Sequence, residues 1–546
     1  MVFTEGCRVY VPATLFVRAV LACALAAAPA ACSKKAALAP PHSGTFVIAV
    51  AQEPRSLNPL YLEGPLAYAI GELSYSYLTN YDSHGNVIAD AAAAVPTFAN
   101  GGIARDGRRI TYRLRRDVLW QDGVPMSAKD VAFSYRAVMN PANAIPSRYP
   151  YDRIASVSAP DPYTVVVRLK QPYSPMVTNF FGGDSNYPIL PAHLLAAYPN
   201  LNRIAYDAAP IGSGPYRMVK WARGERLDAV AYERYYAGKP GLKRVSLHFV
   251  HDSSTVIDQL FTGEADATFF ADVSQIATLR KIPGRRIVVT PVPYFYALAF
   301  NVTDPVLKDV AVRRAFALAV DRRTLVEKAA HGLYDAGTGM RGLFTWAFDP
   351  HANALPYDPR RAAALLARDG WAIGPGGVRT KRGRRLELQL DFYNGSDIAS
   401  EFVPMIAAQE RAAGIDVSTR GYSREEFLAR DGPLVRGTFQ VALYSYQSAY
   451  DPDAAWLLAC SQREPNGFND ARYCNPAVDR ALQRGVAAYG RNARRRAYRF
   501  VQRQLLADMP YAFLCQVSEV DVIPARLKGY ARPLLSPYVS IARWRW

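Results

Sequence analysis

Apolar residues in short alternating or continuous runs recur along the chain, and each run predicts a β-strand. The predicted strands cover residues 45–50, 110–115, 163–169, 294–301, 386–392, 439–443 and 511–523. Other stretches carry helix start and stop signals or apolar residues on one helical face. They predict helices over residues 66–78, from Ser127 onward, over 309–322, over 324–330, over 358–370 and from Asn475 onward. Strands and helices therefore occur along the whole chain.

The stretch from Ile211 to Pro240 predicts a hairpin and has the most distinctive order of residues. It begins Gly212-Ser213-Gly214-Pro215-Tyr216, turns at Arg223-Gly224 and ends Tyr235-Tyr236-Ala237-Gly238-Lys239-Pro240. Glycine gives the backbone freedom and Pro215 fixes φ, so turn chemistry alone accounts for these residue types. Only the length and order of the stretch can point to a family.

Further stretches in a set order accompany the hairpin. They are Glu53-Pro54-Arg55-Ser56-Leu57-Asn58-Pro59, Trp120 to Val131, Gln259 to Asp266, and Lys308 to Arg322. Ser127 with Asp130 forms a capping box inside the second of these. From about residue 44 to 530, the chain resembles the family 5 solute-binding proteins of bacterial ATP-binding cassette (ABC) importers, the group of peptide and nickel binders.

The resemblance implies an α/β fold of the periplasmic binding protein type, with two main lobes, an extra inserted domain and a hinge of two strands. It also implies a first domain made of discontinuous segments. The expected divisions are 1–31 (signal), 32–43 (linker), 44–80, 187–270 and 511–546 (domain I), 81–186 (domain II) and 271–510 (domain III).

The N-terminus reads as an export signal. Arg8 and Arg18 precede the uncharged stretch Ala19–Ala31, which is too short to anchor a protein across a bilayer. Cys32 after small residues is typical of a bacterial lipoprotein site; Cys23 and simple cleavage to a soluble periplasmic protein remain alternatives. The mean hydropathy of the whole chain is -0.08, and it contains no uncharged apolar run near 20 residues. Both observations argue against a membrane-spanning protein.

A formal net charge of +18 raises the possibility of nucleic-acid binding. The basic residues are scattered, however, and the densest runs, 382–385 and 491–496, are interpreted as solvated surface. No nucleic-acid motif accompanies them. We therefore expect no nucleic-acid partner.

Three cysteines follow the signal region. In an exported protein, Cys460 and Cys474 are good disulfide partners because a short polar loop separates them, which leaves Cys515 as a buried free thiol. Metal ligation is the rival interpretation, but no histidine stands near them and no Cys-x-x-Cys occurs.

The chain carries no motif of a hydrolase nucleophile, a zinc protease or a phosphate-binding loop. Gly337-Thr338-Gly339-Met340-Arg341-Gly342 has dinucleotide-site spacing but follows a predicted helix, so we interpret it as a flexible loop. His248 and His251 lie three residues apart in a predicted strand, so their side chains point to opposite faces and cannot easily bind one metal ion. We expect no enzyme activity, no cofactor and no metal site.

A ligand site is predicted in the aromatic stretch 443–456, which the resemblance places at the ligand cleft. Tyrosines with short polar residues suit an apolar pocket with a few orienting groups. The peptide binders of the family have an Asp four residues before the Pro of this stretch to hold the peptide ammonium; here that position is Ser448, unless Asp451 or Asp453 substitutes. The candidate ligand residues are Leu60, Tyr61, Tyr294, Tyr296, Trp346, Tyr444, Tyr446, Gln447, Ser448, Ala449 and Asp451.

The expected function is capture of a solute, an oligopeptide or peptide-like compound, and its delivery to the permease subunits of an ABC importer. A nickel chelate or a sugar as the solute, an extracytoplasmic hydrolase, and a sensor or chaperone-like binder on the same fold are the alternatives. The protein would be periplasmic or otherwise extracytoplasmic, with a lipid anchor to a membrane.

Overall fold

The computed structural model describes residues 44–546 except 63, 186, 353–354, 464–466 and 534–535. The predicted export signal and the whole predicted linker 32–43, including Cys32, lie outside the described residues. Among the residues described, no helix combines the length and the apolarity that crossing a membrane requires.

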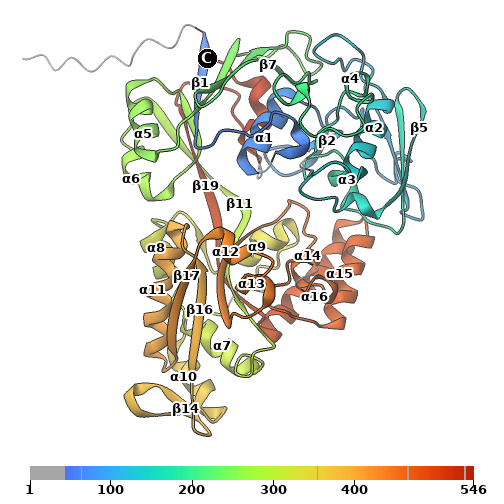
Figure 1. Ribbon diagram of the computed structural model, residues 1–546. Helices are drawn as coiled ribbons and strands as arrows, with labels where there is room; N and C mark the ends of the chain where they lie inside the picture. Colours follow the sequence, from blue (N-terminus) through green and yellow to red (C-terminus); the bar gives the residue numbers. More distant parts are fainter. Residues whose placement is uncertain (1–43, 63, 186, 353–354, 464–466, 534–535) are drawn as a thin grey trace, which may run out of the picture. The chain divides into compact units, whose positions relative to one another are not determined.

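One large mixed sheet organises the described chain (Figure 1). Its strands run in the order β17 (Asp416–Tyr422), β16 (Glu387–Tyr393), β18 (Val441–Gln447), β11 (Arg285–Phe300), β19 (Tyr511–Pro524), β10 (Ala267–Ala271), β1 (Thr45–Val50), β9 (Arg244–Phe249), β8 (Arg226–Ala231) and β7 (Tyr216–Ala222), with β12 (Asp335–Ala336) beside β19. A separate sheet of β4 (Arg109–Arg113), β6 (Thr164–Leu169) and β5 (Ile154–Asp161) belongs to the predicted insertion. The mixed α/β fold is thus confirmed.

Helices accompany the sheet along its whole strand order, from β17 to β7. The longer ones are α1 (Gly64–Ser74), α2 (Ala128–Met139), α5 (Ser253–Thr262), α7 (Val310–Ala319), α8 (Arg322–Ala329), α10 (Pro359–Arg368), α11 (Asp397–Ala412), α15 (Pro476–Ala487) and α16 (Arg491–Asp508). The shorter ones are α3 (Met176–Asn179), α4 (Ala192–Leu195), α6 (Ile276–Leu279), α9 (Gly339–Phe344), α12 (Arg424–Leu428), α13 (Pro433–Arg436) and α14 (Ala455–Leu458).

The strands β11 and β19 are the longest and pair antiparallel from Arg285 opposite Pro524 to Ala299 opposite Tyr511. Alternate residues of β11 lie in two different hydrophobic cores, because successive side chains of a strand point to opposite faces. One core contains Tyr296, Leu298 and Phe300, and the other contains Phe295, Ala297 and Ala299. The first of these cores is closed by α7, α8 and α11, and the second by α9, α15 and α16.

The predicted hairpin is present as β7 and β8, with Gly224 in a left-handed conformation (φ 74°) at the turn. Gly212 and Gly214 have a different purpose from the backbone freedom expected of them. A Cβ on Gly212 would lie 1.6 Å from the carbonyl oxygen of Ser74, and one on Gly214 would lie 2.5 Å from the amide nitrogen of Tyr75. The two glycines therefore allow the hairpin to approach the end of α1.

Several predicted boundaries are wrong. The helix from Asp309 ends at Ala319, because Asp321 accepts a hydrogen bond from the amide of Thr324 and starts α8 instead. The helix over 66–78 ends at Ser74, and β9 ends at Phe249, so His251 lies beyond the strand. Residues 337–342 are not a flexible loop; they lead into α9, where Gly339 packs against Phe513.

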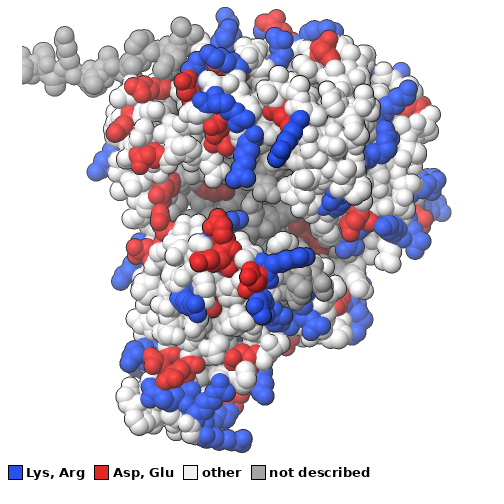
Figure 2. Space-filling view, in the orientation of Figure 1, with Lys and Arg blue, Asp and Glu red and all other residues white. Residues whose placement is uncertain are grey.

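Charged side chains of both signs are interspersed on the face seen in Figure 2, and Lys and Arg gather over the hairpin of β14 (Arg379–Lys381) and β15 (Arg384–Arg385). Some members of this group are already paired. Lys381 contacts Asp369 at 2.7 Å and Arg385 contacts Glu387 at 2.5 Å.

Glu410 is a carboxyl group of α11, the helix that closes one hydrophobic core together with α7 and α8. It is fully buried in α11, and neither of its carboxyl oxygens has a hydrogen-bond partner within the described chain. Burial raises its pKa well above the usual range, and Arg322 opposes that shift only in part. Burial therefore favours the protonated form of Glu410 in the folded protein, whereas in the unfolded chain the carboxyl group is ionised above about pH 4.3.

We expect Glu410→Gln to remove a pH dependence of stability. In the wild type the unfolded state releases this proton first, so the free energy of unfolding falls as pH rises from about 5 toward the raised pKa. Glu410→Gln should flatten that slope and match or exceed wild-type stability at pH 8. Thermal unfolding between pH 5 and 8 measures this, with the exposed Glu387→Gln as control; equal slopes in wild type and Glu410→Gln would contradict it.

Candidate functional site

Four of the predicted ligand tyrosines lie in the central sheet: Tyr294 and Tyr296 in a predicted strand, and Tyr444 and Tyr446 beyond the predicted end of the strand beside it. The strand β18 continues to Gln447, four residues beyond its predicted end, and pairs with β11 so that Tyr294 lies opposite Gln447 and Tyr296 opposite Ser445. Only the residues from Ser448 onward form a loop. The predicted aromatic stretch 443–456 is therefore strand up to Gln447, loop from Ser448 to Ala454 and the start of α14 from Ala455.

Tyr296 and Tyr446 are core residues, with 6% and 4% of their surfaces exposed. The hydroxyl of Tyr446 donates to Asp470 at 2.9 Å, and its ring stacks on Phe295. The hydroxyl of Tyr296 lies 3.1 Å from that of Ser396. Their hydroxyl groups are engaged inside the protein, so neither is placed to contact a solute directly.

Tyr294, Tyr444 and Gln447 are more accessible. The hydroxyl of Tyr294 donates to Ser445 at 2.8 Å, and burial raises the pKa of both tyrosines. Gln447 is exposed, and its amide nitrogen lies 3.5 Å from the hydroxyl of Tyr68 on α1. These side chains lie near the end of β18, where the loop from Ser448 begins.

Ser448 begins the loop and is 5% exposed. Its amide donates to the carbonyl of Pro293 at 2.7 Å, while its hydroxyl has no partner among the described residues. Ala449 beside it is half-buried. The position that would carry a charge in a peptide binder thus holds a buried, unused hydroxyl.

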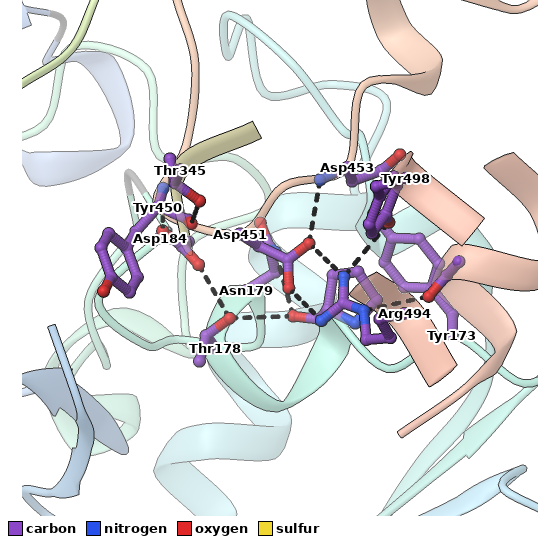
Figure 3. A network of polar contacts seen from close by, with 12 residues as sticks. Tyr173, Thr178, Asn179, Asp184, Thr345, Tyr450, Asp451, Asp453, Arg494 and Tyr498 are labelled. Carbon is purple, nitrogen blue, oxygen red and sulfur yellow. Dashed lines mark hydrogen bonds and ion pairs between the residues drawn. The ribbon is translucent and has the colours of Figure 1, made fainter. Parts of the chain in front are cut away.

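Asp451 forms a buried ion pair with Arg494 of α16 (Figure 3). The guanidinium makes two bonds, of 2.6 Å and 2.5 Å, to the two carboxylate oxygens, and its Nε donates to the carbonyl of Gly485. Burial alone would lower the pKa of Arg494, but the carboxylate of Asp451 raises it. Arg494 is 6% exposed, so the interpretation of the run 491–496 as solvated surface is wrong at this residue.

Two further acids tie the loop to the segment 149–184. Asp453 accepts from the hydroxyls of Tyr173 (2.9 Å) and Tyr149 (3.2 Å). Asp184 accepts from the amide of Tyr450 (2.9 Å) and the hydroxyl of Thr178 (2.8 Å) (Figure 3). Burial, followed by the nearby charge of Asp451, raises the pKa of Asp184 to about 6.

A cavity of about 220 Å³ lies beside this network. It is bounded by the loop, by α16 and by the predicted insertion, through residues that include Tyr81, Phe98, Ser174, Trp346, Tyr450 and Arg494. The ring centres of Tyr81 and Tyr450 lie 4.7 Å apart in an edge-to-face arrangement. Both rings also line a second, smaller cavity, whose wall includes Glu72. The loop therefore contributes Tyr450 and Asp451 to a real cavity.

The structure does not bring every candidate to this place. Asp451 and Trp346 line the cavity. Leu60 is fully buried in another core, and the hydroxyl of Tyr61 donates to Asn202 at 2.8 Å. Burial, with Asp207 adding to it, raises the pKa of Tyr61 to about 12. These two residues pack in that core rather than at the cavity.

Sequence reasoning missed Asp184, Tyr81 and Arg494 as part of the site. They come from stretches hundreds of residues apart, and no local pattern distinguishes them. Within the described ranges, no three His, Cys, Asp or Glu side chains are grouped so that they could hold a metal. A disulfide joins Cys460 and Cys474.

Residues 93–467 match the model of the bacterial extracellular solute-binding proteins, family 5, middle region. The chain belongs to this family. This family 5 protein is 31% identical over 497 residues to Protein XP55 of Streptomyces lividans, covering 90% of this chain and 86% of that one. It is 24% identical to the oligopeptide-binding protein AppA of Bacillus subtilis, covering 94% and 93%.

Among solved structures, the family 5 protein is similar to NikZ of Campylobacter jejuni in complex with Ni(L-His). The TM-score is 0.75 at 28% identity, and the match covers 92% of this chain and 99% of that one. The family is one of extracellular solute-binding proteins. The chain is therefore a member of a family of solute-binding proteins.

We expect Asp451→Ala to lower the free energy of unfolding by about 3–5 kcal/mol, because it leaves the buried guanidinium of Arg494 without its carboxylate. Asp451→Ala combined with Arg494→Met should cost less than the two single changes added together, since the double variant leaves no unpaired charge. Chemical denaturation of the four proteins measures this coupling.

The control is Arg323→Met, which breaks an exposed ion pair with Glu327 and should leave the unfolding midpoint unchanged. Additive effects of the two changes at Asp451 and Arg494 would contradict the coupling.

Proposed function

We propose that this chain is the solute-capturing component of a bacterial ABC importer. It binds its solute outside the cytoplasm, closes around it and presents the closed form to the permease subunits, without chemistry on the solute. The observation that carries the proposal is the cavity beneath the loop 448–454, whose wall is completed by three separate segments of a family 5 fold.

Closure would occur about the strands β11 and β19. We assign residues 44–80, 187–270 and 511–546 to the first domain, 81–186 to the inserted domain and 271–510 to the third. The hydrogen bonds of Asp453 with Tyr173 and of Asp184 with Tyr450 then connect the inserted domain to the third. A solute that contacts both sides favours the closed form, because only differential affinity can shift such an equilibrium.

A peptide or peptide-like compound is the proposed solute, in keeping with the similarity to the oligopeptide-binding protein AppA. The second candidate is a metal chelate. The observation in its favour is Ser448, which supplies no charge for a peptide ammonium, together with the similarity to NikZ.

For attachment to a membrane we propose lipidation of Cys32, with Cys23 or simple cleavage as the alternatives.

Binding should compact the protein. Native mass spectrometry of the purified protein identifies a co-purified solute, and small-angle scattering compares the solute-saturated form with protein stripped by unfolding and refolding. We expect a smaller radius of gyration with solute, because closure brings the domains together. An unchanged radius at saturation would contradict the proposed function.

Ser448→Asp should create or strengthen affinity for free-amine di- and oligopeptides. The new carboxylate is buried and unpaired until a peptide ammonium arrives, so the variant should also unfold at a lower temperature without peptide and recover with it. Calorimetry over a peptide panel measures the affinity.

The matched control is Ser448→Asn, which adds similar volume without charge, and N-acetylated peptides should gain nothing from either variant. No change with Ser448→Asp across the panel would remove the assignment of this loop to the ligand site.

A further inference from the structure

The carboxylates around the cavity of 220 Å³ already accept hydrogen bonds from other protein groups. Asp451 is held by both terminal nitrogens of Arg494, Asp453 by two tyrosine hydroxyls, and Asp184 by the amide of Tyr450 and the hydroxyls of Thr178 and Tyr81. None of these carboxylates is left to pair with a positively charged solute unless an existing bond is broken.

Arg491, in contrast, is a cation of the cavity wall without a carboxylate partner in the described chain. Its guanidinium lies 5.1 Å from the ring centre of Trp346, which also lines the cavity. Arg494 and Arg495 approach the same ring, at 5.3 Å and 5.8 Å, but they are bound to Asp451 and to the carbonyl of Trp346. The surplus charge of the wall is therefore positive and belongs to Arg491.

Two neighbouring features favour an anion at the same place. Arg491 is the first residue of α16, an 18-residue helix whose N-terminus has no side-chain cap, so its first amides carry partial positive charge. Ser174, also in the wall, is 7% exposed, and its hydroxyl has no hydrogen-bond partner among the described residues. A buried hydroxyl without a partner is a donor available to a ligand oxygen.

Apart from Thr97, Thr178 and the ion pair of Asp451 with Arg494, the rest of the wall is aromatic and aliphatic. Phe98, Trp346, Tyr81 and Tyr450 contribute rings, and Pro96, Val87 and Val177 contribute aliphatic surface. The volume is below the roughly 300 Å³ at which drug-sized pockets begin. It suits one apolar or aromatic group that carries one anionic head.

We propose that this cavity recognises a carboxylate attached to an apolar or aromatic body, with Arg491 as the residue that binds the carboxylate above the ring of Trp346. The inference rests on the proposed function and deepens it, because it makes the solute an organic acid rather than an ammonium compound. Ser448 fits the same picture, since the loop offers no charge for an amine.

The test uses N-acetyl-L-phenylalanine, which has the ring and the carboxylate and lacks an amine. Its C-terminal amide, L-phenylalanine amide and inorganic phosphate are the comparison ligands. Isothermal calorimetry with the mature full-length protein should show binding of N-acetyl-L-phenylalanine at least tenfold tighter than binding of the other three, and weaker binding as salt is raised.

Arg491→Gln should weaken this binding at least tenfold, Arg491→Lys should weaken it less, and Arg496→Gln should leave it unchanged. Arg496 is exposed on the same helix, so it controls for loss of net charge. Equal unfolding temperatures of the three variants show that any loss is local.

The inference is overturned if the amide or phosphate binds as tightly as the acid, if Arg491→Gln binds like the wild type, or if the wild type does not bind the acid. If N-acetyl-L-phenylalanine does not bind while a co-purified solute still reduces the radius of gyration, recognition of an acid is contradicted but solute capture is not. If nothing compacts it, the proposed function falls as well.

Discussion

The antiparallel pairing of β11 with β19 is the constraint on which the rest of the structure depends. These two strands connect the part of the sheet that ends in β7 with the part that ends in β17. Because adjacent residues of β11 serve opposite faces, a shift of register by one residue would move every side chain into the wrong core. Tyr294 of β11 lies opposite Gln447, the last residue of β18, so the pairing of β11 with β18 fixes where the loop from Ser448 begins.

Charge neutralisation is the physical basis of the proposed acid site. Around it, each buried carboxylate has its own donors, and the loop is tied to α16 through the ion pair of Asp451 and Arg494. A buried ion pair gives little net stability compared with an apolar pair but is costly to break. Its physical effect here is to hold Asp451 in one place, so that the wall presents only the charge of Arg491 to a solute.

Much of the fold could be predicted from sequence because its signals are local. The capping box of Ser127 and Asp130, the Pro at the start of α10 and the turn at Gly224 each depend on residues a few positions apart. Boundaries that depend on tertiary contacts could not be predicted, such as the end of α7 or the extension of β18 to Gln447.

The site was predictable only in part, for the same physical reason. Asp451 and Trp346 were identified from residue type and from the family resemblance, and both line the cavity. Tyr296 and Tyr446 have the same residue type but fall on strand faces that are buried. Arg494 and Asp184 acquire their roles from partners 43 and 266 residues away, which no local pattern contains.

Cys515 has a consequence for oxidative folding. It lies in β19, fully buried, and burial raises the pKa of its thiol to about 12. Because the thiolate is the species that attacks a disulfide, a thiol held protonated does not exchange with the bond between Cys460 and Cys474. The folded chain can thus keep Cys515 as a free thiol in an oxidising compartment. Unfolding of β19 would expose this thiol and allow it to react.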